Sequence, residues 1–338
     1  MANYSVPADF NSNSIHIFSK LMKKYPGEVI SEVYGSLPIY GSGRGKYIKS
    51  NCNISLEMLK DYISNLKAKN IMFNYCLNFV DFQSENERTD QLSNILYFMG
   101  TLIEIGVEKF TLTIPELIFL ARKTYPNISI SASAITNIDS VKRAQGVQAL
   151  GANSIVLGED CTRNLKLISD IKKSTKLDIS IITNSMCVFN CLYRQSHYIA
   201  ISHERELSQR SISTLYTKWC AEQFAQDLVE YIKSPWIRPE DTELYQRLGI
   251  DIFKIIGRER IHEMKIEPLL DAYMQHNFEG NLLDLIYGFS IKNSVCVDNK
   301  KLDGFINHFM RPYACFSCGS NTCTHCHKYF ENAVVRNE

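Results

Sequence analysis

The stretch that decides the fold is SIVLGEDCTRNLKLISDIKKSTKLDISIITNS, residues 154–185. The segments at its two ends, 154–159 and 178–185, each start with a short run of mostly apolar residues. Such runs are typical of strands that are buried on both faces. The segment 163–175 between them has apolar residues three and four positions apart, which indicates a helix with one buried face. A strand, a helix and a second strand in this order form a unit whose two strands run parallel.

The same alternation continues along most of the chain. Candidate strands lie at 28–37, 70–77, 109–114, 128–135, 154–159, 178–185, 234–239 and 251–257. Helix-like segments separate them, and these eight units predict an α/β fold, a (β/α)8 TIM-like barrel. A doubly wound open sheet is the alternative, but that fold typically has a glycine-rich, phosphate-binding turn after its first strand. The GSGRG of residues 41–45 lacks the G-x-G-x-x-G spacing of that turn.

Three parts of the chain are expected. Residues 1–27 form an N-terminal helix, because apolar residues recur at helical spacing before Pro26 and Gly27. Residues 28–280 form the barrel. Residues 281–338 form a C-terminal cysteine-rich extension that binds metal.

Composition and charge indicate a packed protein without a strong net electrostatic field. The 338 residues include 37 basic and 36 acidic side chains, so the net charge of +1 would not draw the chain onto nucleic acid or an anionic membrane. The N-terminus has no signal-peptide pattern, and no run approaches the ~18 apolar residues that cross a bilayer. We expect a cytoplasmic protein with no membrane partner. A local basic patch, a partner protein and a homo-oligomer stay open.

Cysteines gather after the sixth predicted strand. Cys187 and Cys191 follow that strand in a C-x3-C pattern, and Cys220 lies on the next helical segment. Clustered cysteines in a reducing compartment are more often metal ligands than disulfides, and thiolates select iron-sulfur clusters, zinc or copper(I). We expect an iron-sulfur cluster here. The alternative is a cysteine nucleophile activated by His197, which otherwise is an ordinary packed or hydrogen-bonding histidine.

A second group of cysteines lies in the tail, at Cys315, Cys318, Cys323 and Cys326. Four cysteines in twelve residues predict a metal site, since so short and polar a segment cannot form a core of its own. The four-residue gap between the two C-x2-C halves favours iron-sulfur, with a compact zinc site as the alternative. Either the tail holds its own cluster, or it lends one thiolate to the cluster of the barrel.

Polar residues mark the ends of the predicted strands, where a barrel places its functional groups. Two arginines, Arg238 and Arg258, could together grip a carboxylate or phosphate. A structural ion pair of Arg258 with Glu240 or Glu159 is the alternative. The other candidates for lining the pocket and supplying hydrogen bonds or protons are Asn74, Tyr75, Asn78, Glu159, Asn184, His197 and Glu240.

Four segments together resemble the collagenase-like peptidase family, peptidase family U32. They are FNYCLN (73–78), NSMCVFNC (184–191), SPWIRPED (234–241) and LGIDIFKIIGRE (248–259), and the resemblance covers roughly residues 28–285. It implies an oxygen-independent hydroxylase of the kind that acts on ubiquinone precursors, tRNA or ribosomal RNA.

The resemblance also implies a cofactor. In that group four cysteines hold a [4Fe-4S] cluster, and prephenate is the source of the hydroxyl oxygen. Cys187 and Cys191 match the first two ligands of a C-x3-C variant, and Cys220 fills a later position. The longer gap and glycine of the main family signature are absent, which leaves the fourth ligand unassigned.

The expected function is therefore an iron-sulfur enzyme with one or two [4Fe-4S] clusters that hydroxylates an anionic small molecule, peptide or RNA. Two alternatives belong to other classes. One is a peptidase that uses a cysteine or a zinc-bound water, and the other is a non-catalytic scaffold that binds a peptide or tRNA.

Overall fold

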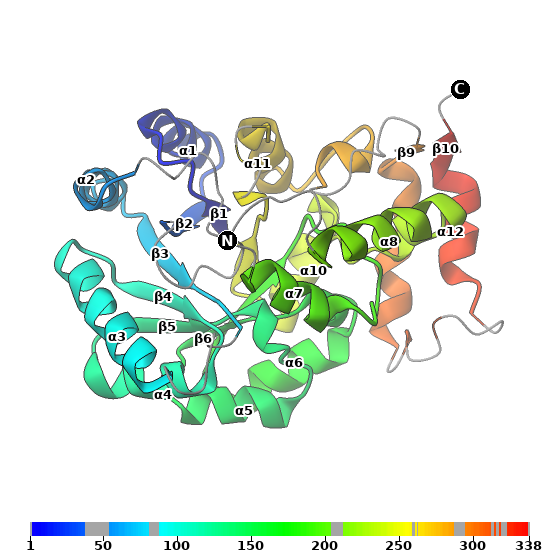
Figure 1. Cartoon of the computed structure of the whole chain (residues 1–338). Helices are drawn as coiled ribbons and strands as arrows, with labels where there is room; N and C mark the ends of the chain where they lie inside the picture. Colours follow the sequence, from blue (N-terminus) through cyan, green and yellow to red (C-terminus); the bar gives the residue numbers. More distant parts are fainter. Residues whose placement is uncertain are drawn as a thin grey trace.

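The computed structural model describes residues 2–37, 54–80, 88–203, 212–258, 261, 263–286, 295–311, 314–315, 318 and 323–336. Eight parallel strands close into a barrel in chain order, and the first strand pairs with both the second and the eighth (Figure 1). The strands are β1 (Asn3–Pro7), β2 (Val29–Gly35), β3 (Met72–Leu77), β4 (Lys109–Leu112), β5 (Ser129–Ala132), β6 (Ser154–Val156), β7 (Asp178–Ile182) and β8 (Ile252–Lys254). The predicted (β/α)8 barrel is confirmed.

The strand prediction needs correction in two places. The sequence analysis missed β1, which lies in the N-terminal part expected to be only a helix, so the barrel begins at Asn3. A strand at 234–239 was predicted wrongly. That segment runs past the end of β7 with a hydrogen bond from Ile237 N to Thr183 O at 2.8 Å, but β7 pairs with β8 directly.

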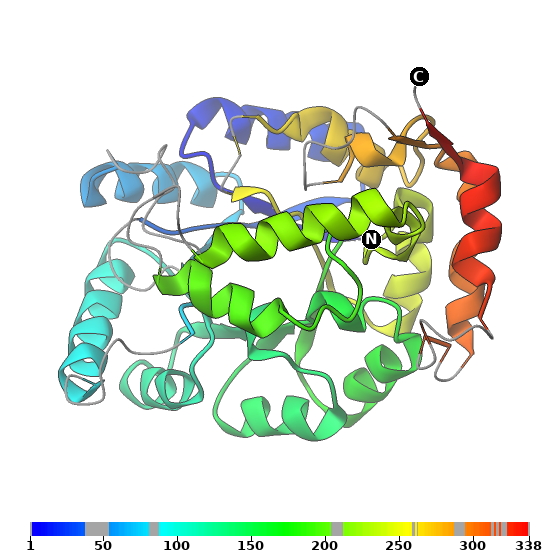
Figure 2. The same ribbon diagram turned by 45° about the vertical axis from the view of Figure 1, so that its right-hand side comes forward.

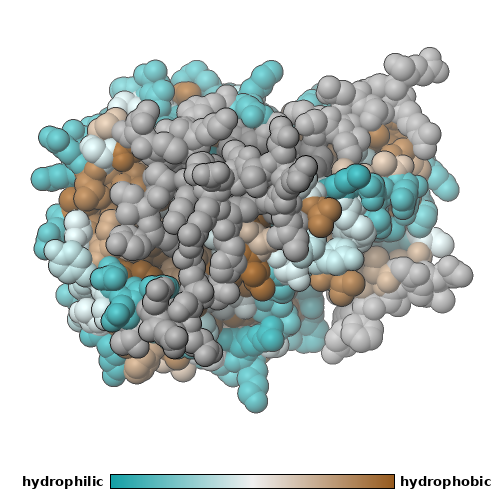
Figure 3. Space-filling model, in the orientation of Figure 1, coloured by the Kyte–Doolittle hydropathy of each residue, from teal (hydrophilic) through white to brown (hydrophobic). Residues whose placement is uncertain are grey.

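Eight helices follow the eight strands, one after each. They are α1 (Ser12–Lys24), α2 (Leu56–Lys67), α3 (Arg88–Glu104), α4 (Pro115–Thr124), α5 (Val141–Ala149), α6 (Leu165–Ser174), α10 (Thr242–Leu248) and α11 (Ile266–Met274). Hydrophilic residues form much of the outline of the molecule on the face seen in Figure 3. No helix in the described part of the chain is long and apolar enough to cross a membrane.

Helix α6 illustrates why these segments fold as they do. Its apolar residues Leu165, Ile168 and Ile171 are buried and half-buried Leu167 packs beside them, whereas the other positions of the helix are polar. The side chain of Asn164 caps its first turn by accepting a hydrogen bond from Leu167 N at 3.1 Å. Lys172 and Lys173 lie in the last turn, where positive charge stabilises the helix dipole.

The connection from β7 to β8 contains extra elements. Before α10 it adds α7 (Arg194–His203), α8 (Ile212–Gln226), α9 (Glu230–Lys233) and the 3-10 turn η4 (Pro239–Asp241). Helices α7 and α8 contact each other and lie across one end of the barrel (Figure 2). Because this connection starts where β7 ends, it covers the end of the barrel at which strand C-termini meet.

The interior of the barrel holds a buried ion pair. Lys109 Nζ on β4 lies 2.6 Å from a carboxylate oxygen of Glu32 on β2, and both side chains are less than a tenth exposed. Ser5 and Asn74 also donate hydrogen bonds to Glu32, at 2.6 and 3.1 Å. Burial opposes ionisation of Glu32, but Lys109 and Lys254 outweigh it and lower the pKa of Glu32 to about 2.

The C-terminal extension packs against one side of the barrel, where it is coloured orange to red in Figure 1. Its antiparallel strands are β9 (Val295–Val297) and β10 (Val334–Arg336). Its helices include α12 (His325–Ala333) and the 3-10 segments η6 (Leu282–Asp284), η8 (Lys300–Leu302) and η9 (Phe305–Met310).

Aromatic contacts join this extension to the barrel. The ring of Phe305 is buried against Trp236, with centroids 5.2 Å apart. The guanidinium carbon of Arg163 lies about 5 Å above the rings of Trp236, Phe305 and Phe309. Arg163 also donates hydrogen bonds to the backbone oxygens of residues 232–234. The extension therefore shares the core of the barrel.

Candidate functional site

A pocket opens at the C-terminal end of the barrel. It holds about 660 Å³ of empty space, including solvent at its mouth. Three predicted residues, Asn78, Glu159 and Arg258, line it together with Tyr198 from α7 and Lys254 from β8. Strand ends and the β7–β8 connection thus build the pocket jointly, as expected for the functional face of such a barrel.

Arg258 and Glu159 lie in this pocket with different partners. Arg258 is 5% exposed, and its Nη1 donates a hydrogen bond to Ser36 Oγ at 3.0 Å. The carboxylate of Glu159 accepts the Tyr198 hydroxyl at 2.9 and 2.8 Å and lies 3.9 Å from Arg194 Nη1. Among the described residues Glu159 thus pairs with Tyr198 and Arg194, and it forms no ion pair with Arg258 within 4.0 Å.

The loop that carries Cys187 and Cys191 is fixed by a partly buried ion pair. Arg194, the first residue of α7, donates to the two carboxylate oxygens of Asp160 at 2.9 and 2.7 Å. Arg194 Nη2 also donates to Val188 O at 3.0 Å, and Asn190 N donates to Asp160 at 2.8 Å. This network ties the chain after β7 to the chain after β6 and sets the position of both cysteines.

Three thiols from distant parts of the chain interact here. The Cys191 and Cys220 thiols form a hydrogen bond, which lowers the pKa of Cys191 to about 6 and raises the pKa of Cys220. Cys187 acts electrostatically on Cys220 and on Arg194. Within the described ranges, no three histidine, cysteine or acidic side chains already have the arrangement of a metal site. The three thiols therefore act on one another, but among the described residues they do not form a group with the arrangement of a metal site.

The four tail cysteines form a separate group. Burial raises the pKa of Cys315 to about 12, and Cys318, Cys323 and Cys326 act on it electrostatically. Burial likewise raises the pKa of Cys318 and of Cys326. The charged side chains that act on this group include Arg163 and Lys233, whereas Arg194 acts on the barrel cysteines.

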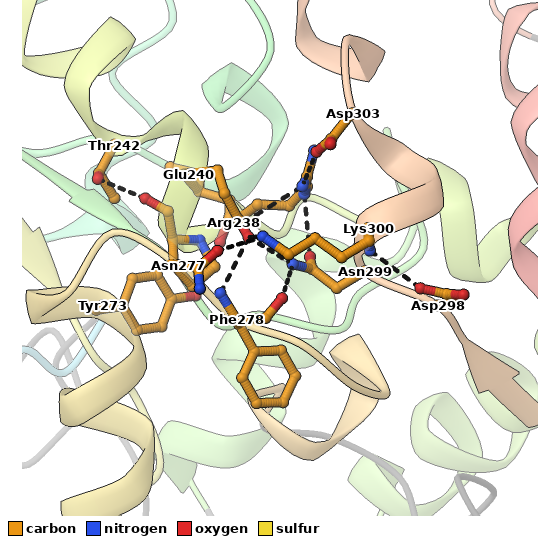
Figure 4. A network of polar contacts seen from close by, with 12 residues as sticks. Arg238, Glu240, Thr242, Tyr273, Asn277, Phe278, Asp298, Asn299, Lys300 and Asp303 are labelled. Atoms are coloured by element: carbon orange, nitrogen blue, oxygen red, sulfur yellow. Dashed lines mark hydrogen bonds and ion pairs between the residues drawn. The ribbon is translucent and has the colours of Figure 1, made fainter.

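Arg238 and Glu240, which the sequence suggested as pocket residues, lie in a different network (Figure 4). Arg238 is 1% exposed and donates to Asn299 Oδ1 at 3.0 Å and to Asp303 at 2.5 Å. Glu240 lies 3.5 Å from Arg238 and accepts hydrogen bonds from Asn299 and Lys300. These contacts fasten the barrel to the C-terminal extension, so we assign both residues a structural role.

The remaining candidates take part in packing and backbone hydrogen bonds. Tyr75 is buried among Phe73, Phe98 and Phe110, and its hydroxyl accepts Leu37 N at 3.0 Å.

Three more candidates also lie among other side chains and backbone groups. Asn74 bonds Glu32 and Thr111 inside the barrel. Asn184 exchanges two hydrogen bonds with the backbone of Ile256, at 3.0 and 2.8 Å. His197 packs against the ring of Tyr216 with centroids 5.6 Å apart.

Sequence reasoning missed several residues of the site. Lys254 was passed over as part of a strand, although a lone lysine inside the apolar run DIFKIIG (251–257) was a usable signal. Arg194 and Tyr198 follow Cys191 by three and seven residues, at helical spacing that puts them on one face. Asp160 gave no signal, because only the fold brings it to Arg194.

Comparisons with known proteins agree with this architecture. A family model described as peptidase family U32 matches residues 29–208, which is over half of the chain. A protein of Methanocaldococcus jannaschii named as an uncharacterized protease is 28% identical over 99% of each chain. A solved structure titled as a U32 peptidase is similar in fold, with a TM-score of 0.52 and 13% identity over 76% of this chain and 93% of the other. The chain belongs to peptidase family U32.

Proposed function

We propose that this chain is an iron-sulfur enzyme that hydroxylates an anionic substrate without oxygen gas. The observation that carries the proposal is the gathering of Cys187, Cys191 and Cys220 beside the mouth of the barrel. The thiols come from a loop after β7 and from α8, which are 29 to 33 residues apart in sequence. So specific a grouping of soft ligands is difficult to explain by packing alone.

The chemistry of this donor set fits an iron-sulfur cluster. Thiolates are the usual ligands of such clusters, and Arg194 supplies a positive charge that favours the ionised thiols. Cys187, Cys191 and Cys220 would hold the cluster, which would supply one-electron chemistry at the end of the barrel. The Arg194 and Asp160 pair would orient the loop so that both of its cysteines face Cys220.

The other residues of the pocket would bind and orient the substrate. Arg258 would bind a carboxylate or phosphate through its guanidinium group. Glu159 and Tyr198 share a short hydrogen-bond path in which a proton can move to or from the substrate. Prephenate, the oxygen donor that the family resemblance implies, is the first compound to test as a ligand of Arg258.

The tail cysteines would form a second site. Cys315, Cys318, Cys323 and Cys326 act on one another and not visibly on the barrel set, which supports two separate sites over one shared cluster. We propose an iron-sulfur cluster there, with zinc as the alternative.

Anaerobic purification tests the proposal. We expect brown protein with absorbance near ~400 nm, containing iron and acid-labile sulfide. Addition of prephenate should perturb that absorbance in the natural protein and have little effect in Arg258→Ala. Colourless protein that contains zinc alone, hydrolyses peptides and loses this activity on thiol alkylation would contradict the proposal and favour the peptidase.

One observation weighs against a cysteine peptidase. The groups that lower the pKa of Cys191 are the Cys220 thiol, the backbone of Tyr193 and the Arg194 guanidinium. A cysteine peptidase activates its nucleophile with a histidine, and no histidine is among these groups. The hydroxylase is therefore the function that the site supports better.

A further inference from the structure

Lys254 is a buried lysine in the pocket that the proposed function does not use. It is the last residue of β8, is 8% exposed and lines the barrel mouth. Its Nζ lies 3.3 Å from the centroid of the Tyr34 ring, which also borders the pocket. A lysine held this deeply at the C-terminal end of a barrel strand lies where barrel enzymes place reactive groups.

Glu32, the carboxylate inside the barrel, forms its ion pair with a different lysine. Glu32 pairs with Lys109 at 2.6 Å and also accepts hydrogen bonds from Ser5 and Asn74. Among the described residues, Lys254 Nζ makes no hydrogen bond and no ion pair within 4.0 Å, and its contact is the face of Tyr34. Glu32 therefore forms its ion pair with Lys109, whereas it acts on Lys254 only through its charge at a longer distance.

The surroundings of Lys254 favour its neutral amine. Burial lowers the pKa of Lys254, and the charges of Lys109 and Arg258 lower it further. Glu32 and Cys76 act in the opposite direction, but they do not reverse the shift. A neutral lysine amine is a nucleophile toward carbonyl carbons, whereas the protonated form is not.

The same pocket offers a second cation that suits a carboxylate. Arg258 lines it, is 5% exposed and is held by Ser36. The carboxylate in the pocket, Glu159, is occupied by Tyr198. A ligand that carries both a carboxylate and a carbonyl would satisfy the guanidinium with one group and meet the amine with the other.

We propose that Lys254 forms a Schiff base with a 2-oxo acid whose carboxylate is bound by Arg258. The amine lone pair attacks the carbonyl carbon, and a proton passes from the nitrogen to the oxygen to give a carbinolamine. The hydroxyl takes up one further proton from solvent and leaves as water, and an iminium remains between Lys254 and the former carbonyl carbon. No electrons are gained or lost, and water is the one product released. The step uses none of the cysteines, but it shares the anion site at Arg258 with the proposed function.

Reductive trapping tests this proposal on the full chain. The protein is incubated with pyruvate and cyanoborohydride, and the modified lysines are located by peptide mass spectrometry. We expect one chief adduct, on Lys254, with the mass of a reduced imine of pyruvate. Labelling of Lys254 should exceed that of the exposed Lys60 by about tenfold or more, because a bound carboxylate raises the local concentration of the carbonyl.

Two variants and a competitor sharpen the result. Lys254→Arg keeps a long nitrogen-bearing side chain but cannot form an imine, so the chief adduct should disappear. Arg258→Met should reduce labelling of Lys254 by about tenfold, the usual effect of losing a charge-assisted hydrogen bond. Lactate has the carboxylate without the carbonyl, and an excess should suppress labelling.

Three results would overturn the proposal. The first is labelling spread over surface lysines while the Lys254 peptide stays unmodified in the natural protein. The second is an adduct on Lys254 that lactate does not suppress. This would show that labelling of the amine does not depend on a carboxylate bound at Arg258. The third is binding of pyruvate and lactate with equal affinity and no adduct, which would make Lys254 a charged anchor.

Discussion

At the scale of single residues, the polar interior of the barrel determines both stability and chemistry. Glu32 forms its ion pair with Lys109, and in the described part of the chain no carboxylate lies within 4.0 Å of Lys254 Nζ. Buried charges are costly unless they are paired, so an unpaired buried lysine in a pocket is better explained by function than by stability. The strand ends thus hold the residues of greatest chemical interest.

Removing the negative member of the buried pair should destabilise the fold. Glu32→Gln leaves Lys109 buried without its partner, and we expect a loss of about 3–5 kcal/mol in the free energy of unfolding at neutral pH. The matched control is Glu108→Gln. Glu108 pairs with Lys67 at 2.6 Å, but the two side chains are 58% and 40% exposed, so the loss should stay below about 1 kcal/mol. Urea denaturation measures both.

The effect of Glu32→Gln should depend on pH in a defined direction. The pKa of Glu32 is about 2 in the fold against an ordinary value of 4.5. The contribution of the ionised Glu32 to the free energy of unfolding is therefore complete above pH 4.5 and is lost as the pH falls through about 2. The difference between natural protein and variant should shrink over that window. A difference that stays constant down to pH about 2.5 would contradict the shifted pKa.

Residue types alone predicted part of the site. Arg258, Glu159 and Asn78 line the pocket as expected, because polar residues directly after a barrel strand point to its mouth. Arg238 satisfied the same rule but turned to Asn299 and Asp303. Those partners are 61 and 65 residues away, and their position depends on how the extension packs. No local pattern could have revealed that contact.

At the scale of elements, helix and strand signals differed in reliability. Helices such as α6 were readily identified, since their buried positions repeat over several turns. Strand β1 was missed because it has five residues, of which Asn3 and Ser5 are polar and Pro7 ends it. The false strand at 234–239 has a similar length and a similar share of apolar residues, so composition could not separate the two segments.

Two glycines in or beside the outer helices should respond oppositely to the same substitution. Gly249 ends α10 with φ +105°, and an added Cβ would lie 2.4 Å from Lys172 Cγ. We expect Gly249→Ala to cost about 1–3 kcal/mol. Gly146 lies within α5 with open space around it, so Gly146→Ala should stabilise by about 0.5–1 kcal/mol. Thermal unfolding of the pair checks both signs, and equal shifts would contradict this assignment.

The contact between barrel and extension should depend on Arg238. Arg238→Met removes the bonds to Asn299 and Asp303, and we expect a loss of about 2–4 kcal/mol, with faster amide exchange in β9 and β10. Lys301→Met is the control, because Lys301 and Asp298 form an exposed pair 3.7 Å apart. Iron content per folded chain should stay the same in both variants. Loss of iron in Arg238→Met alone would contradict the structural role and indicate that Arg238 belongs to the functional site.

At the scale of the whole molecule, barrel and extension form one core. Phe305 is 1% exposed and lies against Trp236, while Arg163 of the barrel stacks on both rings. The sequence indicated a boundary near residue 280, since a cysteine-rich segment differs in composition from the barrel. Composition does not reveal shared burial, so it could not show that the two parts pack together.

This shared core has a consequence for unfolding. We expect the full chain to unfold in one calorimetric transition, because exposing Phe305 also exposes the barrel surface beneath it. A chain that ends at residue 280 should lose cooperative unfolding or aggregate. Two separate transitions in the full chain, or an unchanged transition in the shortened one, would show that the extension is independent.

The central claim is that the thiols of Cys187, Cys191 and Cys220 hold an iron-sulfur cluster at the barrel mouth. Electron paramagnetic resonance of anaerobic, dithionite-reduced protein tests it most directly. The variant in which these three cysteines become serine should lose one iron-sulfur signal. The matched variant Cys296→Ser, which changes a cysteine on β9, should keep every signal. An unchanged spectrum in the triple variant, or no iron-sulfur signal in the natural protein, would contradict the account.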